Sequence, residues 1–174
     1  MGCLWTEDQV YVSFGSNPLE HNIDACYILL MLKVKLLRPG AKAPTIAHPG
    51  EDLGYDIYAA EDVCIAPRAN AVVPTAIAIE LTSAAGEPMG ALLRDKSSLA
   101  SRRLTLTGGV IDAGYRGEIK VLMENLGDAQ GEIHAGDKLA NLIPYAVLTT
   151  PVETVEELAE SSRNRGGFGS SGRK

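Results

Sequence analysis

This chain of 174 residues contains few cysteines, lacks long apolar runs and has no net positive charge. Its three cysteines, Cys3, Cys26 and Cys64, are widely spaced and form no Cys-x-x-Cys pair, which argues against a disulfide framework and a zinc site. The longest apolar run, residues 25–32, is too short for a membrane span of about 20 residues. A net charge of −6 argues against a general nucleic-acid binder, since such proteins are usually basic. We therefore expect neither a nucleic acid nor a membrane as partner.

The first thirty residues differ from the rest. They are not basic and show no cleavage-site pattern, so we expect no signal peptide and a cytoplasmic protein. Their aromatic residues are scattered without period, whereas Met31 opens a regular strand pattern. Residues 1–30 are thus expected to be an extension outside the core, with Met31 as a candidate translation start. The alternative is an added edge strand that packs on the body of the fold.

Turn residues divide the remaining chain into short segments. Nine prolines and eighteen glycines favour strands and turns over long helices. Apolar runs at a spacing of about 8–12 residues predict an all-β sandwich or barrel over residues 31–150, followed by an arm, 151–174. Segment 76–81 is typical of a strand buried on both faces, 38–54 of a loop, and 153–160 of one acidic helical turn. The expected strands are 31–37, 54–60, 63–66, 71–81, 89–93, 104–107, 118–124 and 138–147.

The most informative stretch is 108–120. Val110 and Ile111 lead into a single carboxylate, Asp112, with glycines on both sides and Tyr115 three residues later. The pattern predicts a hairpin, with a strand, a tight turn and a returning strand. Such a hairpin makes a narrow slot lined by backbone N–H and C=O groups, which suits a nucleobase, and Asp112 can then act on the part of the ligand outside it. The alternative is that Asp112 is an Asx-turn residue and Tyr115 belongs to the core.

Two further polar stretches are suited to phosphate. Lys96 offers a charge, and Ser97 and Ser98 offer hydroxyl and N–H groups at an expected helix start, although such a cluster is often only a helix cap. Residues 161–174 combine glycines, serines and four positive charges around one aromatic, Phe168. This composition fits either a polyanion clamp or a disordered tail.

Five separated motifs resemble, in order, those of the trimeric dUTP diphosphatases (dUTPases). The third and fifth motifs are the specific ones, and the resemblance covers residues 31–172. It implies a β-clip or distorted jelly-roll barrel with a flexible C-terminal arm, a homotrimer and three active sites between subunits. The motifs are LGYDIYA (53–59), KSSLA (96–100), GVIDAGYRGEI (109–119), GDKLANLI (136–143) and RNRGGFGSSG (163–172).

The resemblance also implies an activity, the hydrolysis of dUTP to dUMP and pyrophosphate. This reaction keeps uracil out of DNA and supplies dUMP for dTMP synthesis. By the same resemblance Asp112 activates the water that attacks the α-phosphorus, and Mg²⁺ rides on the three phosphates, with Asp56 touching it only through water. The implied substrate-binding residues are Lys96, Ser97, Ser98, Gly109, Val110, Ile111, Tyr115, Lys120, Asn141, Arg163, Phe168, Gly169, Ser170 and Ser171.

The resemblance also implies a role for several of these residues. Tyr115 packs under deoxyribose and excludes a 2′-hydroxyl, Phe168 stacks on uracil, and the serines and Arg163 of the arm grip the γ-phosphate. Lys96 and Asn141 depart from the family, which usually has Arg and Gln there, and Ser98 replaces a Gly. Lysine keeps the charge of arginine but loses its planar fork.

Two other functions compete with this hypothesis. A dCTP deaminase of the same fold needs an acid/base group, and its relatives have a glutamate where this chain has Leu122, which cannot shuttle protons. A non-catalytic nucleotide-binding module needs no positioned base such as Asp112. Among the remaining polar residues, Arg116 and Glu118 are expected to form inter-subunit or surface pairs worth little, and Asp95 and Asp137 to act in turns or caps.

Overall fold

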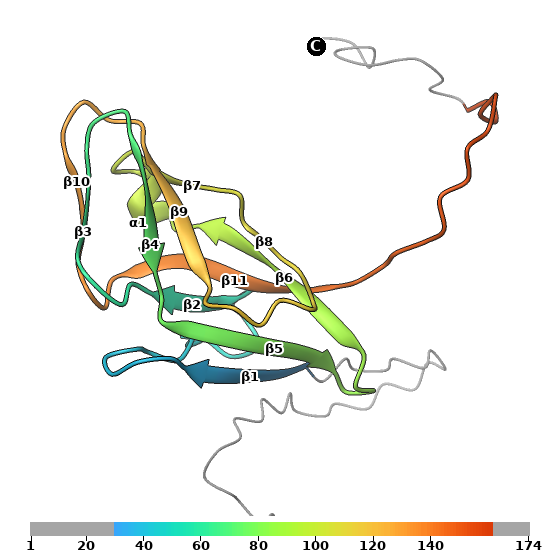
Figure 1. The fold of residues 1–174 in the computed structure, drawn as a ribbon, viewed down its shortest axis with the longest axis horizontal. Helices are drawn as coiled ribbons and strands as arrows, with labels where there is room; N and C mark the ends of the chain where they lie inside the picture. The colour runs from blue at the N-terminus through green and yellow to red at the C-terminus, as the bar shows by residue number, and fades with distance from the viewer. Residues whose placement is uncertain (1–29, 162–174) are drawn as a thin grey trace, which may run out of the picture.

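The computed structural model describes residues 30–161, and these form curled antiparallel sheets with one helical turn (Figure 1). The largest sheet contains six strands: β1 (Leu30–Leu36), β2 (Tyr55–Tyr58), β5 (Ile77–Ser83), β6 (Pro88–Asp95), β8 (Val110–Ile111) and β11 (Lys138–Ala146). Its order is β1-β5-β6-β11-β2, and β8 pairs with β6 off this path. The all-β prediction is therefore confirmed.

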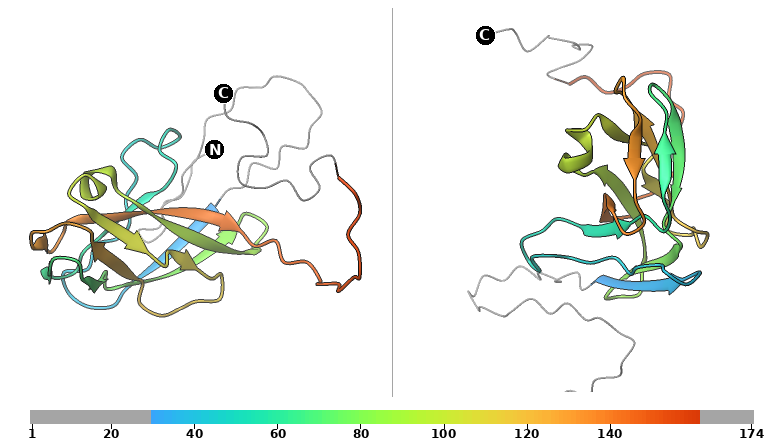
Figure 2. Two further views of the ribbon diagram at one scale, coloured as in Figure 1. Left: turned by 90° about the horizontal axis from the view of Figure 1, so that it is seen from above. Right: turned by 90° about the vertical axis from the view of Figure 1, so that its left-hand side faces the viewer.

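Two smaller sheets complete the body. One has three strands in the order β4 (Asn70–Pro74), β9 (Lys120–Asn125), β7 (Leu104–Thr107), and the other pairs β10 (Gly131–Ile133) with β3 (Val63–Ile65). The single turn α1 (Ser97–Ala100) connects β6 to β7. Figures 1 and 2 show β11 running through the body, with the β10–β3 pair at one end. No helix within residues 30–161 is long and apolar enough to cross a membrane.

The core lies between the curled sheets. Strand β9 alternates, so that Val121 and Met123 point inward and are almost fully buried. Segment 76–81 is buried on both faces as predicted, since consecutive residues Ile77, Ala78 and Ile79 are all buried. A strand that is covered on both faces has a continuous apolar sequence, which explains why the alternation of apolar and polar residues in segment 76–81 is weak.

Two of the sequence-based element predictions are wrong. Segment 71–81 is not one strand but β4 and β5, because the chain turns at Thr75 and Ala76, where Ala76 has a φ of 56°. The turn is held by Thr75 Oγ1, which donates to the Ile119 carbonyl at 2.5 Å. Residues 151–161 form no helical turn, and all of them are exposed, because their apolar side chains Val152, Val155 and Leu158 pack against no other element of the described chain.

Of the two predicted domain boundaries, only the start of the first strand can be compared with the structure in detail. Strand β1 begins at Leu30, one residue before the expected start at Met31. The predictions for residues 1–29 and for the arm beyond Ser161 lie outside the described residues.

Asn125 ties the end of β9 to two neighbouring segments. Its side chain is buried, and Nδ2 donates to the carbonyls of Ile65 (3.0 Å), Ala66 (3.2 Å) and Ala129 (2.8 Å). Its Oδ1 accepts from the Gly127 N–H at 2.9 Å. We expect Asn125→Ala to lower the free energy of unfolding by about 3 kcal/mol, because it leaves several buried backbone groups without partners.

Urea unfolding at one fixed protein concentration measures this loss. The matched control is Asn70→Ala, an exposed asparagine at the start of β4, which should change stability by less than about 0.5 kcal/mol. Equal effects of the two variants would show that water replaces the Asn125 side chain without penalty.

Candidate active site

A pocket of about 340 Å³ opens beside the stretch that the sequence singles out. Its lining mixes backbone of the glycine-rich segment with apolar side chains and a few charged ones. The lining residues are Leu93, Leu106, Thr107, Gly108, Gly109, Val110, Ile111, Asp112, Tyr115, Glu118, Lys120 and Leu122. Of the residues expected to contact the base and sugar, Gly109, Val110, Ile111, Tyr115 and Lys120 all line it, as does Asp112.

The predicted hairpin is wrong in its pairing. Val110 and Ile111 pair with Leu92 and Ala91 of β6, whereas the returning strand β9 pairs with β4 and β7. The chain therefore crosses from the small sheet to the large one and back. A slot between two sheets remains open here, because β8 and β9 are not joined by hydrogen bonds that would close it.

Gly109 sits at the tightest point of this slot. Its carbonyl accepts from the Leu93 N–H at 2.7 Å. A Cβ at this position would overlap the Leu93 carbonyl oxygen and lie 2.8 Å from Leu106 Cδ2. Only glycine fits such a close approach, and the backbone beside it stays accessible from the pocket.

Asp112 and Tyr115 lie on the turn that follows β8, and both are exposed. The turn is closed by backbone, since the Tyr115 N–H donates to the Asp112 carbonyl at 3.0 Å. Among residues 30–161 the Asp112 carboxylate has no hydrogen-bond partner, so an Asx-turn does not account for it. Tyr115 is 45% exposed and donates its hydroxyl to the Glu118 carbonyl at 3.0 Å, so the alternative that it belongs to the core is wrong.

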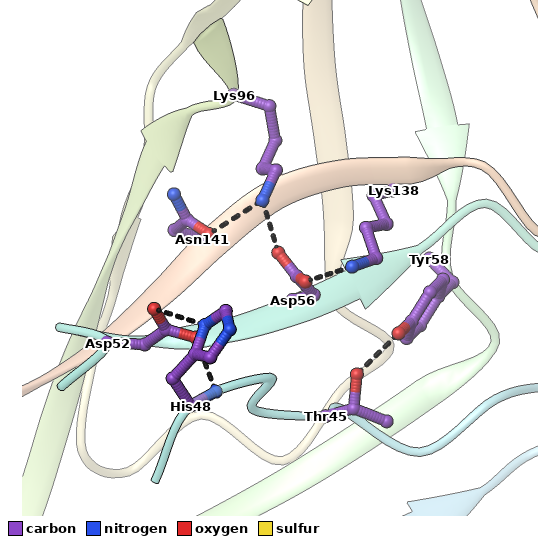
Figure 3. Close-up of polar contacts among 8 residues, drawn as sticks. All are labelled: Thr45, His48, Asp52, Asp56, Tyr58, Lys96, Lys138 and Asn141. Carbon is purple, nitrogen blue, oxygen red and sulfur yellow. Dashed lines mark hydrogen bonds and ion pairs between the residues drawn. The ribbon is translucent and has the colours of Figure 1, made fainter. Parts of the chain in front are cut away.

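A second polar cluster surrounds Asp56 on β2 (Figure 3). Lys96 Nζ lies 2.5 Å from Asp56 Oδ1, and Lys138 Nζ lies 2.7 Å from Asp56 Oδ2. Lys96 Nζ also donates to Asn141 Oδ1 at 3.3 Å. Three predicted residues, Asp56, Lys96 and Asn141, are thereby brought together, and Lys138 joins them. We call these four residues the Asp56 cluster.

The Asp56 cluster carries a net charge of +1, with the carboxylate almost buried. Burial disfavours the ionised carboxyl, but hydrogen bonds and charge attraction from Lys138 and Lys96 outweigh it and lower the pKa of Asp56 below its usual value of 3.8. In turn, the hydrogen bond to Asp56 raises the pKa of Lys138. Both partners therefore keep their charges at neutral pH.

This lowered pKa makes part of the stability depend on pH. Because Asp56 binds its proton more weakly in the folded chain than in the unfolded one, its pairing stabilises the fold at neutral pH and is lost as the pH falls below about 4. We expect Asp56→Asn to be less stable than wild type at about pH 7, and this difference to shrink toward about pH 3. Urea unfolding across that range measures it. A difference that does not depend on pH would contradict the assignment.

The helical turn α1 starts where the sequence predicts. Lys96 is its N-cap residue and makes no side-chain cap hydrogen bond, and Ser97 and Ser98 are exposed in the first turn. Their hydroxyls and N–H groups thus face solvent near Lys96 and are not used to cap the helix. The alternative that this stretch is only a cap is not supported by these contacts.

The pocket and the Asp56 cluster lie on opposite edges of β6. Strand β8 pairs with one edge, and β11, which carries Asn141, pairs with the other. Since Ile111 lies opposite Ala91, Asp112 is level with Gly90, six residues before Lys96, a separation along the strand of about 20 Å. No residue that lines the pocket belongs to the cluster.

Sequence reasoning missed several residues of these sites. Leu93, Leu106 and Thr107 line the pocket although no role was assigned to them. Glu118 forms an ion pair with Arg38 at 3.0 Å, in line with the expected pairing, but its side chain is partly buried (18% exposed) and Oε1 also accepts from the Ala76 N–H at 2.8 Å, a role that was not expected. A signal was present, because the charge of Glu118 falls within a specific motif.

The remaining predicted residues, Arg163, Phe168, Gly169, Ser170 and Ser171, lie outside the described residues. No group of three or more His, Cys, Asp or Glu side chains within residues 30–161 is arranged to hold a metal ion.

The sequence of this chain is similar to those of known proteins. The family model described as dUTPase matches residues 40–172. The deoxyuridine 5′-triphosphate nucleotidohydrolase of Clostridium tetani is 39% identical over 145 residues, covering 82% of this chain and 97% of the relative. The corresponding protein of Solibacter usitatus is 40% identical over 154 residues, covering 83% and 97%.

Solved structures agree. The dUTPase of Staphylococcus bacteriophage 80alpha, solved with dUpNHpp, superposes with a TM-score of 0.75 at 30% identity, covering 82% of this chain and 99% of the phage protein. A variant dUTPase of phage phi11 of S. aureus, described as revealing the coordination of a structural Mg(II) ion, gives a TM-score of 0.67 at 29% identity, covering 75% and 99%. On sequence and on fold alike, this chain belongs to the dUTPase family.

Proposed function

We propose that this protein hydrolyses dUTP to dUMP and pyrophosphate, which removes dUTP from the precursors of DNA and supplies dUMP. The observation that carries the proposal is the pocket, which is lined together by Gly109, Val110, Ile111, Asp112 and Tyr115. Its volume of about 340 Å³ lies within the range of small-molecule sites.

Recognition of the base rests on backbone and apolar contacts. The accessible backbone around Gly109 can pair with the edge of uracil, and Leu106 and Leu122 provide apolar walls. Tyr115 is held by its hydroxyl on the Glu118 carbonyl, so its ring is fixed where the sugar would lie. A fixed ring against the sugar leaves no room for a 2′-hydroxyl, which accounts for a preference for deoxyribose. Lys120 adds a positive charge at the pocket wall.

The chemistry needs one base. Asp112 accepts a proton from a water molecule while the water oxygen attacks the α-phosphorus, and the bond from that phosphorus to the α,β-bridging oxygen breaks. Pyrophosphate leaves with the bonding electrons, and the proton stays on the Asp112 carboxylate until solvent removes it. The exposed carboxylate of Asp112 supports this role, because no group among residues 30–161 competes for it.

The Asp56 cluster would bind the phosphates. Lys96 uses two of its three protons on Asp56 and Asn141, and the third can reach a phosphate oxygen. Asn141 accepts from Lys96 through Oδ1, so its Nδ2 is free to donate to phosphate. Ser97 and Ser98 add exposed hydroxyls at the α/β-phosphates.

Mg²⁺ is expected to arrive with the substrate, bound to its phosphates. The described residues fit this arrangement, because they offer no cage of protein ligands and only one carboxylate, Asp56, in the cluster. Each Asp56 oxygen accepts from one lysine and retains a lone pair that can accept from a metal-bound water. Magnesium commonly keeps several waters and takes its other ligands from phosphate.

The complete site requires more than one copy of the chain. If each is in hydrogen-bond reach, the carboxylate of a base that activates water at the α-phosphorus and the ammonium group of a lysine on the α-phosphate lie within about 10 Å of each other. Asp112 and Lys96 of one chain are about 20 Å apart along β6. We propose a homotrimer in which Asp112 of one subunit meets the Asp56 cluster of another. Arg163, Phe168, Gly169, Ser170 and Ser171 then close over the site.

A panel of nucleotides tests the activity. Pyrophosphate release with Mg²⁺ is expected from dUTP and not from dCTP, dTTP or UTP. Ammonia release from dCTP would show a deaminase, although Leu122 at the pocket wall offers no proton-transfer group. Binding of dUTP without turnover would leave a non-catalytic binding module.

A further inference from the structure

Lys138 reaches Asp56 because of an irregularity in β11. Asn141 lies opposite Asp56 and Ala140 opposite Ile57, but Lys138, not Leu139, lies opposite Tyr58. The strand therefore contains a β-bulge at Leu139. In a regular ladder, residues three apart point to opposite faces, so Lys138 would face away from Asn141.

The bulge reverses this orientation. Leu139 and Ala140 are both buried, so two successive residues point inward, and Lys138 moves onto the face that carries Asp56 and Asn141. Bulges are frequent beside active sites, where they redirect a side chain. In β11 the redirected side chain ends in an ion pair with the almost buried Asp56 carboxylate at 2.7 Å (Figure 3).

We propose that Lys138 is a positioning residue for nucleotide binding, acting through Asp56 to keep Lys96 available to the triphosphate. The proposal rests on the function proposed above. Lys138 binds Oδ2 and leaves Oδ1 to Lys96, so that neither lysine alone has to neutralise the carboxylate.

The charges explain why this matters. The side chain of Asp56 is 9% exposed, that of Lys96 21% and that of Lys138 48%. If Lys138 is removed, Lys96 is the only cation among residues 30–161 that pairs with the almost buried carboxylate. Lys96 is then held more tightly by Asp56 and is less available to the phosphate oxygens of the triphosphate.

The test measures binding separately from turnover. For Lys138→Met we expect the Kd for dUpNHpp and the KM for dUTP to rise together by about tenfold, with kcat changed by less than about threefold, because the lost interaction precedes chemistry. Lys138→Arg should restore both values to within about threefold, since arginine keeps the charge and reaches Asp56. Should Lys138→Met fail to fold, Lys138→Gln carries the same expectation.

Lys33→Met is the matched control. Lys33 also pairs with a carboxylate across two strands, Glu80 at 2.6 Å, but on β1 and β5, outside the Asp56 cluster and the pocket lining. Its removal should leave the Kd and the KM unchanged. Equal values for wild type and Lys138→Met would overturn the proposal.

A double-mutant cycle separates action through Asp56 from direct contact with phosphate. In an Asp56→Asn background, Lys138→Met should weaken dUpNHpp binding by less than about twofold, because the carboxylate on which Lys138 acts is gone. Additive effects would show that Lys138 contacts the nucleotide itself, and the proposal would be wrong. Because the readout is binding of an analogue, a wild type that binds dUpNHpp but does not hydrolyse dUTP would contradict the proposed function and leave this test intact.

Discussion

Replacing Asp112 with asparagine is expected to slow dUTP turnover by about 1,000-fold, because removal of a general base typically reduces rates by about 100- to 10,000-fold. Asparagine keeps the shape of the side chain but cannot accept a proton from water. The Asp112 carboxylate has no partner among residues 30–161, so the fold should not depend on it. The Kd for dUpNHpp is therefore expected to stay within about threefold of wild type.

Single-turnover hydrolysis and calorimetric titration with dUpNHpp give the two quantities. Asp128→Asn is the matched control: it removes an exposed aspartate that pairs with Arg68 at 2.6 Å and lies outside both the pocket and the Asp56 cluster. Its turnover should equal that of wild type. If Asp112→Asn kept more than about a tenth of the turnover, another group would have to be the base.

The sequence predicts the position of the pocket and of the turn α1 because both signals are local. The pattern of Val110, Ile111 and Asp112 between glycines locates the pocket, and the helix start at Ser97 locates α1, which we propose to lie beside the phosphates. Such signals depend on neighbouring residues, whose φ preferences and apolar pattern determine the local backbone.

What the sequence misses depends on partners far along the chain. Strand β8 has two residues, too few to show which strand it joins, and it pairs with β6 although β9 is nearer in sequence. The bulge at Leu139 leaves no glycine or proline as a signal, so the pairing of Lys138 with Asp56 follows only from the register against β2. The break between β4 and β5 does have a signal in Pro74, which ends β4, but the turn at Ala76 is held by Glu118, 42 residues away.

Two inactive variants are expected to regain activity when they are assembled together. Lys96→Met should lose most phosphate binding, and Asp112→Asn should lose the base, so each homotrimer alone should be almost inactive. If each site takes Asp112 from one chain and Lys96 from another, a randomly mixed trimer has a probability of about one quarter that a given site contains both intact residues. Denaturing the two variants together and refolding them should therefore restore about a quarter of the wild-type activity.

The same two proteins refolded separately and then combined are the control, and they should stay inactive for as long as subunits do not exchange. A variant chain that carries both substitutions, refolded with wild type, gives a second reference. In this second mixture a site is intact only when both chains that form it are wild type, so the mixture should keep about a quarter of the wild-type activity. If the first mixture regained nothing while the second kept half of the wild-type activity, each site would lie within one chain. The distance between Asp112 and Lys96 across β6 would then have to close by a rearrangement of the large sheet, which the paired β6, β8 and β11 strands oppose.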